Sequence, residues 1–100
     1  MGIFMLVFDD IYISDKLIKK KKKIISALRH GKMFDSNVFV IYLNTNTNLP
    51  EIMQGYFFNQ IYFQSTSVRL LGLTDSKDEA INYLIEFVLS KYSIQKLDMY

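Results

Sequence analysis

The chain has 100 residues, of which 50% are apolar and 15% aromatic, and its formal net charge is +2. This length predicts one domain, and the apolar fraction excludes a disordered tail. The absence of cysteine excludes disulfides, thiolate catalysis and cysteine-based zinc sites, and it fits a reducing compartment.

The N-terminal segment has the features of neither a signal peptide nor a membrane span. Its apolar run, Ile3–Phe8, is short, lacks a basic flank and ends at Asp9 and Asp10. No run in the sequence approaches the roughly 18 apolar residues that a membrane span needs. We therefore expect a cytoplasmic protein with no membrane partner.

Ile3–Phe8 has the length of a strand, and a continuous apolar run is typical of a strand that is covered on both faces. A helix should follow, capped by Ser14 or Asp15 and ended by Gly31. Its apolar stripe consists of Leu17, Ile18, Ile24, Ile25 and Leu28.

Val38–Leu43 is the second predicted strand, because β-branched and aromatic residues dominate it. The polar residues 44–48 then form a turn. Asn48 and Glu51 have the spacing of a helix cap, and Pro50 suits a first helical turn. These signals predict a helix that runs through Phe63.

Val68–Leu73 is the third predicted strand, and a polar break and a helix follow it. Ser76 and Glu79 have the spacing of a capping box. Apolar residues then recur at helical spacing as far as Tyr92. Residues 93–100 have no strong pattern, so we expect them to be a short tail.

Strands that alternate with helices predict parallel pairing through right-handed crossovers. We therefore expect an α/β fold, with one β-α-β-α-β-α domain over residues 1–92 and a three-stranded parallel sheet. The alternative is a ferredoxin-like α+β fold, which requires that Ile61–Phe63 extends as a strand.

Two stretches of the sequence have the form of known α/β elements. VRLLGLTDSKDEAINYLIEFV is a strand with a hydrophobic-Gly-hydrophobic step before a helix beginning Glu-Ala, and KKKIISALRHGK precedes the strand VFVIYL. Over residues 16–89 the chain thereby resembles a family of small uncharacterised bacterial α/β proteins. The resemblance implies the α/β fold and brings with it no activity or functional residue.

Oxygen-bearing residues follow each of the three predicted strands, and their loops should converge at the edge where open α/β sheets bind their ligands. Asp9, Asp10 and Asp75 could there hold Mg²⁺ for phosphate-ester chemistry, although helix caps and turns use the same residue types. The four glycines are scattered, so no phosphate-binding loop is present, and His30 is the only histidine. The sequence therefore favours a non-catalytic protein without a cofactor.

Residues 16–32 hold eight basic residues and no acidic one, whereas the remainder holds four basic and ten acidic residues. This asymmetry predicts a basic helix that could bind nucleic acid or another polyanion. The candidate contacts are Lys19, Lys20, Lys22, Lys23 and Arg29. The alternative is a solvated helix face that keeps a small protein soluble.

The aromatic residues of the second predicted helix cannot all face one core, and surplus aromatic residues gather at protein interfaces. Exposed sheet edges also invite pairing. We therefore expect a non-catalytic protein-interaction domain, either a homo-oligomer such as a homodimer or a complex with another protein. The interface candidates are Tyr56, Phe58, Tyr62 and Tyr92.

Overall fold

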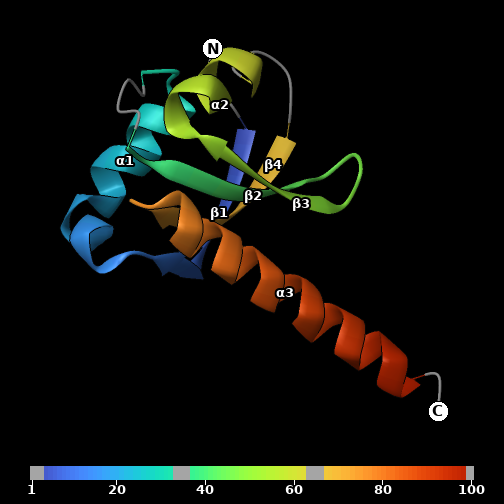
Figure 1. The fold of residues 1–100 in the computed structure, drawn as a ribbon. Helices are drawn as coiled ribbons and strands as arrows, with labels where there is room; N and C mark the ends of the chain where they lie inside the picture. Colours follow the sequence, from blue (N-terminus) through green and yellow to red (C-terminus); the bar gives the residue numbers. More distant parts are fainter. Residues whose placement is uncertain (1–3, 33–36, 63–66, 99–100) are drawn as a thin grey trace.

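The structure is a computed structural model that describes residues 4–32, 37–62 and 67–98. Its elements in chain order are β1 (Phe4–Ile13), the 3₁₀ helix η1 (Asp15–Lys20), α1 (Lys21–Arg29), β2 (Phe39–Asn44), β3 (Leu49–Gln54), α2 (Gly55–Tyr62), β4 (Ser67–Thr74) and α3 (Lys77–Asp98). The strands form one four-stranded sheet in the order β1-β4-β2-β3 (Figure 1). The chain is thus a small mixed α/β domain.

The sheet is mixed, so the prediction of a purely parallel three-stranded sheet is wrong. β1 and β4 are parallel as predicted, but β2 runs antiparallel to both β4 and β3. The alternative also fails, because Ile61 and Tyr62 belong to α2 and do not form a strand. Phe63 lies outside the described residues.

A tight hairpin between β2 and β3 reverses the direction of the chain after β2. Asn48 adopts a left-handed conformation with φ 59°, and its backbone N–H donates to the Asn44 carbonyl at 2.7 Å. Asparagine tolerates this conformation better than most residues. The predicted cap at Asn48 and Glu51 is therefore wrong, since Leu49–Gln54 is an edge strand and the helix begins only at Gly55.

β1 is five residues longer than its predicted end at Phe8. Its register with β4 shifts between Val7 and Tyr12, so the irregular stretch between them accommodates the two aspartates within the strand. Gly72 of β4 permits the close approach beyond this bulge, because a Cβ atom there would lie 3.0 Å from the Tyr12 carbonyl oxygen.

Helices cover both faces of the sheet (Figure 1). Residues of η1, α1 and α2 form one buried cluster with the first face, including Leu17, Leu28 and Phe58. The first half of α3 packs on the other face through Ala80, Tyr83, Leu84 and Phe87, and its second half extends beyond the sheet (Figure 1). The α3 helix ends at Asp98, so its predicted end at Tyr92 is wrong.

One residue of the apolar stripe predicted for the first helix, Ile18, is exposed and was therefore wrongly assigned to the buried side. Leu17, Ile24, Ile25 and Leu28 are buried as predicted, whereas Ile18 is 56% exposed. Residues 15–20 form a 3₁₀ helix, whose three residues per turn rotate Ile18 away from the stripe of α1. Gly31, at φ 70°, follows the end of α1 as predicted, with the Lys32 N–H bonded to the Ala27 carbonyl.

Candidate functional site

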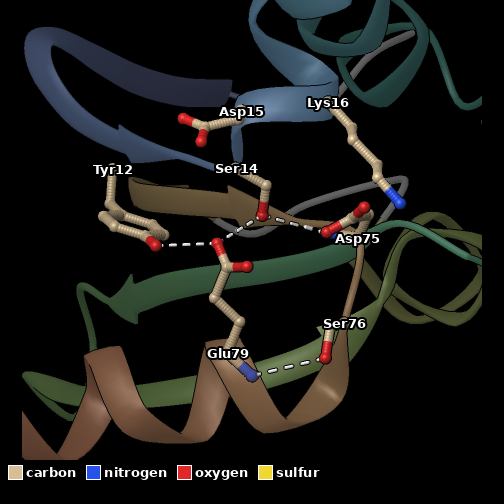
Figure 2. Close-up of a pocket in the computed structure, with 7 residues that line it drawn as sticks. All are labelled: Tyr12, Ser14, Asp15, Lys16, Asp75, Ser76 and Glu79. Atoms are coloured by element: carbon tan, nitrogen blue, oxygen red, sulfur yellow. Dashed lines mark hydrogen bonds between the residues drawn. The ribbon is translucent and has the colours of Figure 1, made fainter.

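A polar hollow of about 480 Å³ lies where the carboxyl ends of β1 and β4 meet. Parallel strands bring their carboxyl ends to one edge of the sheet, which is where α/β folds commonly bind ligands. The lining residues are Tyr12, Ser14, Asp15 and Lys16 from the first segment, and Asp75, Ser76 and Glu79 from the second (Figure 2).

Glu79 is the centre of the hydrogen-bond network in this hollow. Its Oε2 atom accepts hydrogen bonds from the Tyr12 hydroxyl at 2.7 Å and from the Ser14 hydroxyl at 2.5 Å (Figure 2). The Asp75 backbone N–H donates to Ser14 Oγ at 3.2 Å, and Ser14 is only 3% exposed. The network therefore holds the end of β1 against the first turn of α3 by hydrogen bonds. Because Ser14 is buried within this network, it is not accessible as a nucleophile.

Two tyrosines at or near the hollow have raised pKa values. The hydrogen bond to Glu79, then partial burial and the Glu79 charge, raise the pKa of Tyr12 to about 12. Its ring stacks on Tyr83 with centroids 4.9 Å apart. Burial and the charge of Asp10 raise the pKa of Tyr83, while Arg69 lowers it. Tyr12 therefore stays protonated as a donor at neutral pH.

The predicted acidic residues are not gathered as expected. Asp75 lines the hollow, whereas Asp10 lies within β1 and acts on Tyr83. Asp9 also belongs to β1, but its side chain lies outside the described residues. Across the described side chains, no three carboxylates or histidines are grouped so that they could hold a metal ion. The magnesium site stays a prediction.

The asparagine-rich turn does not join this edge, so the predicted convergence of three loops is wrong. Because β2 is antiparallel to β4, Asn44 pairs with Val68 at the start of β4, and Thr45 donates to the Ser67 carbonyl at 2.8 Å. The turn thus lies at the opposite end of the sheet. In its place the edge gains Tyr12, Ser14 and Glu79. The sequence pattern indicated Ser14 and Glu79 only as helix-capping residues.

The capping box itself is half formed. The Glu79 backbone N–H donates to Ser76 Oγ at 3.4 Å, as the spacing predicted. The Glu79 side chain, however, bonds to Tyr12 and Ser14. The carboxylate that would complete the local cap therefore accepts long-range hydrogen bonds instead.

The predicted basic surface is exposed. Lys19, Lys20, Lys22 and Lys23 are solvent-exposed on η1 and α1. Arg29 is also exposed, and its Nη2 atom donates to the Met5 carbonyl of β1 at 3.1 Å. The five candidates therefore lie on one continuous helical segment, on the side of the sheet opposite α3.

The aromatic candidates are divided between core and surface. Phe58 is fully buried and packs edge-to-face on Tyr42 with centroids 5.0 Å apart, so its assignment to an interface is wrong. Tyr56 is exposed, and so is Phe57. The side chains of Tyr62 and Tyr92 lie outside the described residues. A helix that packs on a sheet must bury one face, and Phe58 rather than its neighbour occupies that face.

An exposed apolar stripe runs along α3, and it includes Ile81 and Val88, which the helical periodicity had wrongly assigned to the side that packs on the sheet. Ile81, Ile85, Val88 and Leu89 are between 36% and 56% exposed. They follow one another at i, i+4, i+7 and i+8, on a side of the helix that is turned away from Tyr83 and Phe87, which pack on the sheet. We call these four residues the α3 stripe.

A second apolar feature lies near the start of the same helix. A hollow of about 400 Å³ is lined by Phe39, Ile52, Met53, Gln54, Phe57 and Lys77. Ile81 follows Lys77 by one helical turn, so the α3 stripe begins beside this hollow.

Comparisons of the chain with protein-family models, curated proteins and solved structures gave no match. In the segments that the structure describes, no helix combines the length and apolar character that a membrane crossing requires.

Proposed function

We propose that this chain is a non-catalytic protein-interaction domain, which pairs with a second copy of itself through the α3 stripe. The observation that carries the proposal is the exposure of Ile81, Ile85, Val88 and Leu89 along one side of a helix. Contiguous exposed apolar surface on a small domain is typical of an interaction site, whereas single exposed apolar residues need no explanation.

The geometry of α3 favours another helix as the partner surface. Spacings of four, three and one residues give the narrow apolar seam that helices use to pack against each other. Ile81 and Ile85 lie in the half of α3 that packs on the sheet, but on a side turned away from the sheet-facing Tyr83 and Phe87, so a second helix can lie along the stripe without displacing this packing. Tyr92, four residues after Val88, continues this spacing in the sequence.

The charges of α3 favour a second copy in antiparallel orientation. Residues 77–86 carry a net charge of −2, and residues 89–98 carry a net charge of +1. Antiparallel pairing places the acidic half of each helix beside the basic half of its partner, whereas parallel pairing places like charges together. A two-fold axis then makes the two contacts equivalent, as in most homodimers.

The sheet edges are less suited to pairing. The outer strand β1 is interrupted by its bulge, and Arg29 occupies the carbonyl of Met5. The other outer strand, β3, contains Pro50 and Glu51. Bulges, proline and charged side chains are the features that protect edge strands from association. The helical surface is therefore the better candidate.

Sedimentation velocity over a range of micromolar concentrations tests the proposal, with Ile85→Glu as the variant. Ile85 is 49% exposed, so burying the rest of it in both copies contributes about 1.5–3 kcal/mol per dimer. Losing this contribution should weaken the dimer about ten- to a hundredfold, and the buried carboxylate should weaken it further.

Ser90→Glu is the matched control, since it adds the same charge at an exposed position on the polar side of the same helix. We expect the wild type and the control to dimerise and Ile85→Glu to be a folded monomer. A wild type that is monomeric at every concentration would contradict the proposal, as would equal weakening by both variants.

A further inference from the structure

We infer that the groove between α1 and the edge strand β1 binds the phosphate groups of a nucleic-acid strand. This hollow has a volume of about 410 Å³ and is lined by Val7, Lys22, Ile25, Ser26, Arg29 and His30. Two of its residues, Lys22 and Arg29, are cationic and none is acidic. It lies on the side of the sheet opposite α3, so it is separate from the surface proposed for self-association.

The spacing of the lining residues suits a chain of phosphates. Lys22, Ser26 and Arg29 lie at i, i+4 and i+7, so they form one row along α1. Seven residues of helix span about 10.5 Å, and a duplex carries one phosphate per about 3.4 Å of each strand. The two cations at the ends of the row can therefore contact different phosphates of one strand, with the Ser26 hydroxyl between them.

The side chains in the groove retain donors for an anion. Arg29 uses Nη2 for its bond to Met5, and a guanidinium has five N–H donors. The Nδ1 atom of His30 lies 2.8 Å from the Ser26 carbonyl oxygen. A carbonyl only accepts, so Nδ1 carries the hydrogen and Nε2 remains for other contacts.

The surroundings extend the positive surface. Lys19, Lys20 and Lys23 are exposed beside the groove, and residues 16–32 contain no acidic residue. The rest of the chain has ten acidic and four basic residues, so a polyanion is attracted to this face and repelled by the others. None of the lining residues is a phenylalanine, tyrosine or tryptophan, so affinity should come mainly from phosphates and should depend little on sequence.

A concave groove favours a nucleic-acid strand over an anionic membrane. A strand can enter a hollow beside β1, whereas a flat bilayer would meet only the rim lysines and the exposed Ile18. The two partners therefore differ in their dependence on Ser26, which lies inside the groove.

Fluorescence anisotropy of a labelled oligothymidylate tests the inference, with the full chain titrated at several salt concentrations. We expect log Kd to vary linearly with log salt concentration, and Lys22→Gln to reduce the slope by about 0.7, the value for one phosphate contact on a single strand. Lys77→Gln removes the same charge from an exposed side chain outside the groove and should leave the slope unchanged.

A second matched pair separates the groove from general surface charge. Ser26→Glu should weaken binding at least tenfold, whereas Ser90→Glu, which adds the same charge on α3, should change it less than threefold. No binding at low salt would overturn the inference, and so would equal effects within either pair. Retention on phosphatidylserine vesicles that is insensitive to Ser26→Glu, without oligonucleotide binding, would also overturn it and would assign the lysines to a membrane surface.

Discussion

The hydrogen bonds from Tyr12 and Ser14 to Glu79 should contribute a measurable part of the free energy of unfolding. In Glu79→Ala, the buried Ser14 hydroxyl loses its acceptor, and leaving a buried donor unsatisfied costs about 1–3 kcal/mol. The Tyr12 hydroxyl loses the same acceptor, but its side chain is 37% exposed, so water can replace the bond at little cost. We therefore expect Glu79→Ala to lower the free energy of unfolding by about 1–3 kcal/mol, and most of the loss to come through Ser14.

Urea unfolding followed by circular dichroism measures this loss, at a protein concentration low enough to exclude dimer formation. Glu86→Ala is the matched control, because Glu86 is exposed on the same helix and its loss should change stability by less than about 0.5 kcal/mol. In a double-mutant cycle, Ser14→Ala should make the Glu79→Ala change much smaller. Equal destabilisation by Glu79→Ala and Glu86→Ala, or additive effects in the cycle, would refute the reasoning.

Three further predictions concern the core, the pH dependence and metal binding. Phe58→Ala should cost about 3–5 kcal/mol because it empties a fully buried site, whereas Phe57→Ala should cost less than about 1 kcal/mol; urea midpoints compare the two. The pKa of Tyr12 is raised to about 12 from 10.0, so its stabilising effect is complete below pH 10 and is lost as the pH rises toward 12; thermal melts should show a smaller alkaline loss in Tyr12→Phe. If Asp9, Asp10 and Asp75 hold Mg²⁺, millimolar Mg²⁺ should raise the melting temperature, because a ligand that binds only the folded state stabilises it; an unchanged melting temperature would contradict the predicted site.

Local patterns predicted most of the secondary structure but not the direction of the strands. The strands at 38–43 and 68–73 were placed to within one residue and the start of the last helix was correct, because apolar runs and caps are local signals. The strand that was not predicted, β3, determines the topology of the sheet. Its hairpin depends on the left-handed conformation of Asn48, and Asn48, Pro50 and Glu51 also satisfy the rules for a helix start.

The candidate site was only partly predictable for the same reason. Asp75 was placed at the correct edge because β4 was correct, whereas the end of β1 was set at Phe8, before the bulge. The partners of Glu79 are Ser14 and Tyr12, 65 and 67 residues away in the chain, and no local spacing predicts such contacts. The α3 stripe was hidden within a helix that is apolar on two sides, since periodicity does not distinguish a buried side from an exposed one.

Cross-linking at single introduced cysteines tests the self-association of the chain most directly. The chain has no cysteine of its own, so Ile85→Cys and Ser90→Cys each place one thiol on α3, within and outside the stripe. We predict that a short bismaleimide reagent joins two copies of Ile85→Cys and leaves Ser90→Cys largely monomeric. Equal yields of covalent dimer from the two variants, or none from Ile85→Cys, would contradict the account.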